Sequence, residues 1–285
     1  MISNTQFEKE LEIIVANALR EDVGDGDHSS LACIPEDAQG KAQLLVKDTG
    51  IIAGIAFAER VFQAVDSNLD VHCLMEEGTV VKPGDVVLTV SGSTQAILKA
   101  ERLVLNAVQR MSAIATKTHS YVALLEGTHT KILDTRKTTP GIRALEKWAV
   151  KIGGGVNHRF ALYDAIMLKD NHIDFAGGIS QAIQKTQAYL AATGNDLELI
   201  VEARNLEEVR EILRSDGVHR ILLDNFNYED TRKAVAMING KCQTESSGNI
   251  NEDTLRNYAQ CGVDFISSGA LTHSIYNMDL SLKAC

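Results

Sequence analysis

The feature that most limits the fold of this chain is a regular alternation of short apolar runs and helical patterns across its second half. The apolar runs are residues 131–133, 165–168, 197–201, 220–223, 241–244 and 264–266. Amphipathic helical patterns lie between several of them, as at residues 179–186 and 206–213. Alternating β and α units predict parallel strands joined by crossover helices. The runs are continuously apolar, as expected of strands that are buried on both faces.

Polar groups follow each of these predicted strands. They are, in chain order, Asp134, Arg136 and Lys137, then Lys169 and Asp170, then Glu202, then Asp224 and Asn225, then Glu245, Ser247 and Gly248, then Ser267, Ser268 and Gly269. In an α/β barrel the carboxyl ends of the strands converge at one mouth, where catalysis takes place, whereas an open doubly wound sheet spreads them along one edge. Because polar groups follow all the strands, we favour a barrel, with fewer strands than a complete one.

The first half of the chain has a different pattern. Residues 6–20 predict an amphipathic helix. From residue 41 to 91 short β-like runs alternate with glycines, and a helix is expected at residues 56–65. The sequence KPGD at residues 82–85 predicts the turn of a hairpin between two valine-rich strands.

A long helical pattern at residues 97–125 follows and carries Arg102 and Arg110. Each of these two arginines could serve a functional site, or it could be a solvated or salt-bridged residue at the surface.

Composition excludes several classes of protein. The net charge of -10 argues against nucleic acid as the main partner. No apolar run approaches the ~20 residues of a membrane span, and the first residues do not have the pattern of a signal peptide. The five cysteines are odd in number, far apart and never in a CxxC pair, so we expect reduced thiols in the cytoplasm rather than disulfides or a zinc site.

One segment, residues 134–159, is cationic within this acidic chain. After Asp134 it carries Arg136, Lys137, Arg143, Lys147, Lys151, His158 and Arg159 against the single acid Glu146. A local positive field predicts an anionic ligand, the alternative being a solvated basic face. A ligand is favoured because the first two cations stand where a strand ends. The last two follow the glycines at 153–155, which bring the backbone close to another element.

The polar groups divide into three electrostatic sets. The cationic set is Arg102, Arg136, Lys137, His158, Arg159 and Lys169. Arginines bind planar carboxylates in bidentate fashion. Two carboxylates at neighbouring strand ends, Glu202 and Asp224, suit a divalent metal or ribose hydroxyls, or they are salt-bridge partners of the lysines.

The third set consists of two loops, Ser247-Gly248 and Ser268-Gly269-Ala270, whose backbone N–H groups precede helix-like segments and suit a phosphate. Together the sets predict a ligand with carboxylates, phosphates and a metal-bound sugar. Lys169 has an alternative, because Schiff-base aldolases also keep a lysine at a strand end.

The segment DTRKTTPGIRALEKWAVKIGGGVNHR, followed in order by DAIMLKDNH, IVEARN, LLDNF, ESSGNI and SSGALTHS, resembles the quinolinate phosphoribosyltransferase family. EDVGDGD near the N-terminus and ERLVLNAVQRMSAIAT on the long helix extend the resemblance to nearly the whole chain. The resemblance implies phosphoribosyl transfer from phosphoribosyl pyrophosphate to quinolinate with decarboxylation. The products are nicotinate mononucleotide, pyrophosphate and CO₂, in de novo NAD biosynthesis.

The resemblance also implies a fold and an assembly. Residues 1–113 would form an open-faced α/β sandwich, and residues 114–273 an incomplete α/β barrel of about six strands. Residues 274–285 would form a C-terminal tail that returns to the first domain. The enzyme would be a cytoplasmic homodimer that uses Mg²⁺, in which Arg102 reaches the neighbour's site.

By matching position, the resemblance assigns roles to the site residues. Those that hold the two quinolinate carboxylates would be Arg102, Arg136, His158 and Arg159, with Thr135 in the same binding loop. Those that act on the reacting groups would be Lys137, Lys169, Glu202 and Asp224. The lysines would face the phosphate charge, and the carboxylates would hold the ribose hydroxyls and Mg²⁺. Those that bind the 5′-phosphate would be Ser247, Gly248, Asn249, Ser268, Gly269 and Ala270.

Ser246, Asn249 and Ser268 depart from the family pattern in the phosphate loops. Asparagine tolerates positive φ better than most residues, so we expect the turn at Asn249 to survive.

Three other functions are alternatives to the expected one. They are a phosphoribosyltransferase for a monocarboxylate base, a Schiff-base aldolase that uses Lys169, and an anion-binding protein that has lost turnover.

Overall fold

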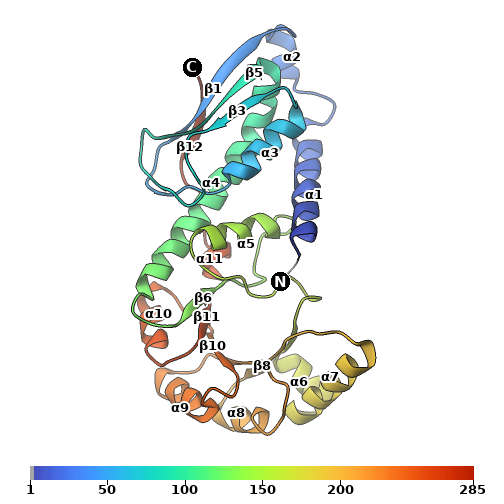
Figure 1. Ribbon diagram of the computed structural model, residues 1–285, viewed down its shortest axis with the longest axis vertical. Coiled ribbons are helices and arrows are strands. Elements are labelled where there is room, and N and C mark those ends of the chain that lie inside the picture. The colour runs from blue at the N-terminus through green and yellow to red at the C-terminus, as the bar shows by residue number, and fades with distance from the viewer. Residues whose placement is uncertain (1–2) are drawn as a thin grey trace. The chain divides into compact units, whose positions relative to one another are not determined.

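The computed structural model describes residues 3–285, which divide into two compact units. Of the described residues, unit 1 contains Ser120–Lys137 and Gly155–Ala270, and unit 2 contains residues 3–119, Thr138–Gly154 and Leu271–Cys285 (Figure 1). The units are discontinuous in sequence, whereas the predicted domains were the continuous ranges 1–113 and 114–273 with the tail 274–285. No helix in the described part of the chain has the length and apolar composition that crossing a bilayer requires.

Unit 1 is built on a six-stranded parallel sheet. Its strands are β6 (Lys131–Leu133), β7 (Ile166–Leu168), β8 (Leu199–Ala203), β9 (Arg220–Asp224), β10 (Gln243–Ser247) and β11 (Phe265–Ser267). The spatial order is β6-β11-β10-β9-β8-β7. Successive strands from β7 to β11 are neighbours and the last pairs with the first, as in a barrel, and the order does not reverse in mid-sheet as in a doubly wound fold. The predicted incomplete barrel is confirmed, with its opening between β6 and β7.

Helices connect the strands of unit 1 from β7 to β11. They are α6 (Asp170–Ala176), α7 (Ile179–Thr193), α8 (Leu206–Ile212), α9 (Tyr228–Ile238) and α10 (Glu252–Ala259). The short helix α11 (Ala270–His273) follows β11, and only its first residue belongs to unit 1. Asn205 and Asn227 begin α8 and α9, because their side-chain oxygens accept N–H groups of the first turn. Such caps are each worth ~1 kcal/mol. The two capping residues lie two and three residues beyond the ends of β8 and β9 and so fix the loops that carry part of the predicted site.

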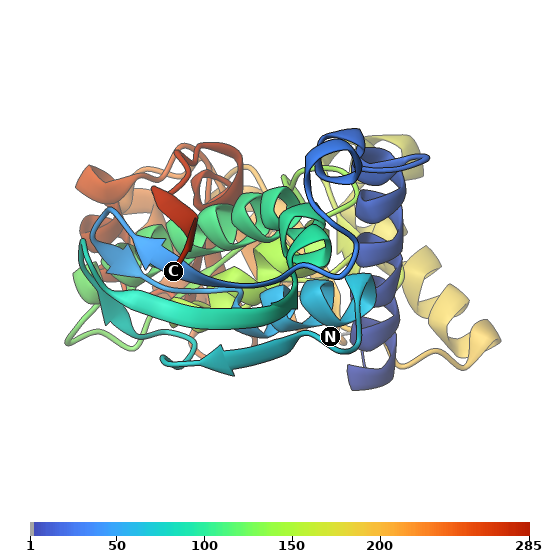
Figure 2. The same ribbon diagram turned by 90° about the horizontal axis from the view of Figure 1, so that it is seen from above.

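Unit 2 contains a four-stranded antiparallel sheet of order β12-β1-β5-β3. Its strands are β1 (Gln39–Val46), β3 (Asp70–Cys73), β5 (Val86–Ser93) and β12 (Leu280–Ala284). Ala42, Leu44 and Val46 are buried and alternate with more exposed residues, so one face of β1 is covered and the other is open. Figure 2 shows the red C-terminal strand β12 beside the blue β1, with which it pairs.

The helices of unit 2 are α1 (Asn4–Val23), α2 (His28–Cys33), α3 (Ile55–Val65), α5 (Arg143–Ile152) and most of α4 (Thr94–Leu124), whose last residues belong to unit 1. Three of these helices match predicted positions, whereas α2 and α5 had not been predicted. The predicted helices at 6–20, 56–65 and 97–125 are thus confirmed.

The predicted hairpin around residues 82–85 is wrong. The turn exists, but β4 (Val80–Val81) pairs with β2 (Gly50–Ile51), not with β5. The reason is that β5 is a central strand, with β1 on one side and β3 on the other, so neither of its edges is available to β4.

The glycine cluster at 153–155 has the close backbone approach that the sequence predicts. A Cβ atom at Gly153 would collide with the carbonyl oxygen of Ala115 on α4 and lie 2.7 Å from Cβ of Thr118. Gly154 has φ 89°, a left-handed conformation that favours glycine. The end of α5 therefore packs directly against the backbone of α4 within unit 2.

Gly153→Ala should destabilise the protein by about 1–3 kcal/mol, since the added methyl group forces α5 away from α4. Thermal unfolding monitored by circular dichroism measures the effect. The exposed Lys151→Ala on the same helix is the control, expected to change stability by less than about 0.5 kcal/mol. An unchanged Tm for Gly153→Ala would mean that the two helices can separate without cost.

Candidate active site

The predicted site residues other than Arg102 all belong to unit 1, where they occupy the carboxyl ends of the strands and the loops that follow. They are Thr135, Arg136, Lys137, His158, Arg159, Lys169, Glu202, Asp224, Ser247, Gly248, Asn249, Ser268, Gly269 and Ala270. Arg102 lies on α4 in unit 2 with its side chain exposed. Unit 1 alone therefore supplies both cationic and acidic groups.

Residues 156–158 extend the edge of β6. The N–H of Val156 donates to the carbonyl of Ile132 at 2.9 Å, and the N–H of Asp134 donates to the carbonyl of Val156 at 3.2 Å. The buried carboxylate of Asp134 accepts the backbone N–H of His158 at 2.8 Å. This pairing places His158 and Arg159 at the carboxyl end of β6, beside the loop that follows the strand.

Arg159 and Arg136 form the cationic part of the site. Nη1 of Arg159 donates to the carbonyl oxygen of Ala165 at 3.0 Å, and Arg136 is exposed. Burial and then the charge of Arg136 lower the pKa of Arg159, while Asp164 acts in the opposite direction. The two guanidinium groups therefore repel each other, and an anion bound between them would relieve this repulsion. Lys137 is exposed, and its N–H donates to Oγ1 of Thr135 at 3.0 Å in the same loop.

Glu202, Asp224 and Lys169 form a second group at the ends of the adjacent strands β8, β9 and β7. Nζ of Lys169 lies 3.8 Å from Oε2 of Glu202. Glu202 as a residue is only 7% exposed. Burial is the largest cause that raises the pKa of Glu202, and Asp224 adds to it, while Lys169 opposes it. Nδ2 of Asn225 donates to Oδ2 of Asp224 at 2.8 Å and orients it.

Glu202 and Asp224 have the chemistry that a divalent cation would need, but a metal bound there would require further ligands from outside the chain. Among residues 3–285 no three His, Cys, Asp or Glu side chains cluster as metal ligands. Mg²⁺ commonly keeps several waters and is bound through one or two carboxylates together with substrate phosphates. Glu202 and Asp224 are such a pair, and Asp224 acts electrostatically on Glu202.

The loop after β10 turns sharply at Gly248 and Asn249. Gly248 has φ 104°, and a Cβ atom there would lie 2.6 Å from Cγ of Asn225. Asn225 itself donates its N–H to the carbonyl of Ser247 at 2.9 Å. Asn249 adopts φ 49°, so the expectation that an asparagine can hold this turn is confirmed. The β9 and β10 loops thus support each other.

The two serines that depart from the family pattern are buried. The N–H of Ser268 donates to the carbonyl of Leu133 at 3.0 Å, and its hydroxyl donates to the carbonyl of Ile250 at 3.3 Å. Ser268 therefore links its loop to β6 and to the β10 loop rather than presenting a side-chain donor at the surface. Ser246 is also buried, and its hydroxyl has no hydrogen-bond partner among the described residues.

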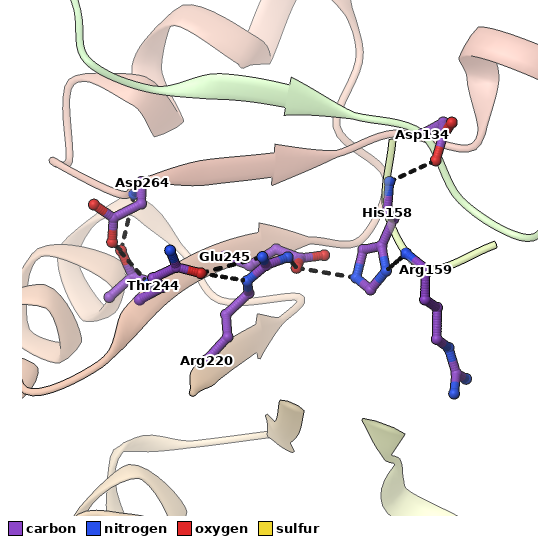
Figure 3. A network of polar contacts seen from close by, with 8 residues as sticks. Asp134, His158, Arg159, Arg220, Thr244, Glu245 and Asp264 are labelled. Atoms are coloured by element: carbon purple, nitrogen blue, oxygen red, sulfur yellow. Dashed lines mark hydrogen bonds and ion pairs between the residues drawn. The ribbon is translucent and has the colours of Figure 1, made fainter. Parts of the chain in front are cut away.

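Sequence reasoning missed a buried network formed by Arg220, Glu245 and His158, shown in Figure 3. Glu245 is fully buried, and its Oε2 lies 3.0 Å from Nη1 of Arg220 and 3.2 Å from Nε2 of His158. Burial acts to raise the pKa of Glu245, but His158, Arg220 and a hydrogen bond from Ser267 lower it overall. The available signal was a pair of opposite charges at two successive predicted strands, Arg220 at the start of one and Glu245 directly after the next.

Two family models match the chain. The model described as "Quinolinate phosphoribosyl transferase, N-terminal domain" matches residues 27–112, and the one described as "Quinolinate phosphoribosyl transferase, C-terminal domain" matches residues 114–283. Curated relatives match over almost the same span. The chloroplastic nicotinate-nucleotide pyrophosphorylase (carboxylating) of Oryza sativa subsp. japonica is 43% identical over 290 residues, which cover 96% of this chain and 77% of the rice protein. Quinolinate phosphoribosyltransferase (decarboxylating) 1b of Nicotiana tabacum is 43% identical over 290 residues, covering 96% of this chain and 82% of the tobacco protein.

Solved structures agree with these matches. The crystal structure of NadC from Streptococcus pyogenes is 38% identical, with a TM-score of 0.89 over 100% of this chain and 99% of that one. The nicotinate-nucleotide pyrophosphorylase from Francisella tularensis is 36% identical, with a TM-score of 0.90 over 100% of this chain and 98% of that one. With both family models matched in order and full-length relatives above a third identical, the chain belongs to the quinolinate phosphoribosyltransferase family.

Proposed function

We propose that this enzyme transfers the phosphoribosyl group of phosphoribosyl pyrophosphate to quinolinate with decarboxylation, in de novo NAD biosynthesis. The products are nicotinate mononucleotide, pyrophosphate and CO₂. The observation that carries the proposal is the position of Arg136 and Arg159 at the carboxyl end of β6, in the same unit as the group of Lys169, Glu202 and Asp224. A dicarboxylate fits the first pair of residues, and a charged sugar phosphate fits the second group.

The arginines recognise quinolinate in this proposal. A guanidinium group matches the geometry of a carboxylate with two parallel N–H donors, so Arg136 and Arg159 suit the two adjacent carboxylates. Binding also relieves the repulsion between the two cations. His158 remains a predicted ligand of the same diacid. Arg102 is proposed to reach this site from a second copy of the chain in a homodimer, and its exposure on α4 supports this role.

The sugar phosphate occupies the remaining groups. Glu202 and Asp224 hold the ribose hydroxyls and a substrate-borne Mg²⁺, which neutralises pyrophosphate charge when bound. Lys137 and Lys169 face the phosphates. The residues proposed to bind the 5′-phosphate are those of the β10 and β11 loops, Ser247, Gly248, Asn249, Ser268, Gly269 and Ala270. Ser268 acts there by holding the two loops together.

The chemistry needs no dedicated base. The pyridine nitrogen attacks the anomeric carbon while the bond to pyrophosphate breaks and its electron pair leaves with the oxygen. Positive charge develops on the sugar, where Glu202 and Asp224 stabilise it, while the lysines stabilise the leaving group. The product is a pyridinium, which accepts the electron pair released when the 2-carboxylate leaves as CO₂. A proton from solvent then occupies that carbon.

No structural observation favours the Schiff-base aldolase. A lysine nucleophile must be neutral, which a desolvated or cation-rich pocket achieves. Lys169 instead has a side chain that is 51% exposed and lies 3.8 Å from the carboxylate of Glu202.

A cytoplasmic location is also part of the proposal, and it is supported by the five cysteines, all of which are free thiols in the structure.

The decisive experiment incubates the purified protein with quinolinate, phosphoribosyl pyrophosphate and Mg²⁺. We expect nicotinate mononucleotide and CO₂ in equal amounts, detected by chromatography and by release of label from the 2-carboxylate. Nicotinate in place of quinolinate should give no product, whereas turnover of nicotinate would identify a monocarboxylate phosphoribosyltransferase. Tight binding of both substrates without any product would instead identify an anion-binding protein and overturn the proposal.

A further inference from the structure

We propose that Glu245 is a positioning residue, which acts through His158 to hold Arg159 in place for the substrate carboxylate. This inference rests on the proposed function, because it assigns Arg159 to the binding of quinolinate. Glu245 is fully buried, so it supports the site from the interior of the protein. The guanidinium group of Arg159 points away from Glu245 in Figure 3 and donates to the carbonyl of Ala165. Glu245 therefore influences Arg159 through the imidazole between them.

The contacts form a continuous series from the interior of the barrel to the site. Arg220, at the start of β9, lies 3.0 Å from the carboxylate of Glu245 on β10. The same carboxylate oxygen lies 3.2 Å from Nε2 of His158, and Nδ1 of His158 accepts the backbone N–H of Arg159 at 2.7 Å. Arg220 is itself fixed, because Nε and Nη2 donate to Oε1 of Gln243 at 3.3 and 3.2 Å.

The contacts of the imidazole select one tautomer. Nδ1 of His158 accepts a hydrogen bond from a backbone amide, so this nitrogen carries no proton. The ring proton is then on Nε2, which faces the carboxylate of Glu245. With the N–H of His158 held by Asp134 as well, the residue is fixed at its backbone and at both ring nitrogens. Its ring links β10 to the backbone of Arg159.

Arg220 explains why an acid can occupy this position. A buried carboxylate without a counter-charge is strongly destabilising. Arg220 supplies that charge from within the barrel, so an ionised Glu245 can lie 3.2 Å from Nε2 of His158. The charges of Glu245 and Arg220 cancel, and the positive charge of Arg136 and Arg159 stays available to an anionic ligand. Without Arg220, the negative charge of a carboxylate in this position would weaken the positive electrostatic potential around Arg136 and Arg159.

The test replaces Glu245 by glutamine, which preserves the shape of the side chain but removes its charge and one of its two acceptor oxygens. Because partners that orient a binding group commonly affect function by about 10–100-fold, we expect Glu245→Gln to raise KM for quinolinate about tenfold. KM for phosphoribosyl pyrophosphate should stay unchanged. Asp264→Asn is the matched control, since Asp264 accepts hydrogen bonds from Thr244, the residue before Glu245, away from the imidazole. It should lower Tm and leave both KM values unchanged.

A second measurement does not depend on turnover. In ¹⁵N-histidine NMR spectra of the ligand-free protein, the His158 signals, assigned by their loss in His158→Gln, should show an unprotonated Nδ1 and a protonated Nε2. Glu245→Gln should weaken this tautomer preference. If Glu245→Gln lowers Tm but leaves both KM for quinolinate and the tautomer unchanged, Glu245 is only a structural residue and the inference is wrong.

Arg220→Lys covers the case in which Glu245→Gln does not fold. It keeps the charge but loses the fork of donors, and it should raise KM for quinolinate in the same direction by a smaller factor; an unchanged value would overturn the inference. Failure of the wild-type protein to form nicotinate mononucleotide would sink the proposed function alone, because the NMR measurement still tests whether Glu245 fixes His158.

Discussion

Glu202→Gln should lower kcat by about 100-fold or more and at the same time raise the Tm of the ligand-free protein. The loss of activity follows from the position of Glu202 beside the sugar, where a fixed carboxylate stabilises the positive charge of the transition state. Removing a single preorganised electrostatic group commonly costs about 10²–10³ in kcat. A glutamine of the same shape can still accept a hydrogen bond from a ribose hydroxyl, so KM for phosphoribosyl pyrophosphate should change much less than kcat.

The gain in stability follows from the raised pKa of Glu202, which burial causes and Asp224 increases. A carboxyl group whose pKa is higher in the folded than in the unfolded protein prefers to be protonated in the folded state. Its stabilising contribution is therefore complete below the unfolded pKa and is lost as the pH rises through the folded pKa. At neutral pH the ionised Glu202 reduces stability, and an uncharged glutamine avoids this cost despite the lost attraction to Lys169.

Thermal unfolding at several pH values tests this account. The excess stability of Glu202→Gln over the wild type should be largest at neutral pH and should shrink as the pH falls towards 4.5, the ordinary pKa of a glutamate. Glu207→Gln is the matched control, since Glu207 lies on the following helix α8 with an 81% exposed side chain and forms an ion pair with Arg210. It should change neither kcat nor Tm appreciably. A lower Tm for Glu202→Gln would show that Lys169 compensates the buried charge fully.

The fold of unit 1 could be predicted because its signals are local. Five of the six strands carry buried apolar residues and appear as short apolar runs, whereas β10 is buried but consists of polar residues. The chain order of the strands is also their spatial order from β7 to β11. The hairpin at residues 82–85 could not be predicted correctly, since the turn is local but the choice of partner is not. The partners of β5 are β1 and β3, which lie farther away in sequence than β4.

The cationic segment 134–159 shows where pattern reasoning about the site reaches its limit. Arg136, Lys137, His158 and Arg159 belong to unit 1, while Arg143, Lys147 and Lys151 belong to unit 2. Lys147 is 1% exposed, so it is not part of a basic surface at all. A run of similar charges in sequence therefore joins residues with different positions in the fold, and only strand ends and helix caps reveal which of them share a site.

The buried network was missed for a related reason. Arg220 begins one predicted strand and Glu245 follows the next, and their pairing depends on the register of β9 and β10, in which Arg220 lies opposite Gln243. The contact of Glu245 with His158 further requires that residues 156–158 extend the edge of β6. Neither relation has a sequence signal of its own. The conformation of Asn249 was predictable, by contrast, because it depends on an intrinsic backbone preference.

Arg136→Ala should raise KM for quinolinate by about 100-fold and leave kcat within about threefold of the wild-type value. A charge-assisted hydrogen bond contributes roughly 1.5–3 kcal/mol, and a tenfold change in affinity corresponds to about 1.4 kcal/mol. Loss of a bidentate contact with a substrate carboxylate therefore weakens binding by at least two decades. The effect falls on KM because the carboxylate contact is made equally in the ground and transition states.

Structural damage should not contribute to this effect. Arg136 is exposed, and its charge lowers the pKa of Arg159, so its removal relieves a repulsion within the folded protein. Arg210→Ala is the control, because Arg210 is a half-exposed arginine of the same unit whose partner is Glu207 on the same helix. Arg136→Lys keeps the charge without the fork of donors and should give a KM between those of the wild type and Arg136→Ala. Steady-state kinetics of Arg136→Ala, Arg136→Lys and Arg210→Ala distinguish the loss of positive charge from the loss of the bidentate donor geometry. If Arg136→Ala has nearly normal kinetics, Arg136 does not hold the diacid, and if Arg136→Lys matches the wild type, positive charge alone is sufficient for binding.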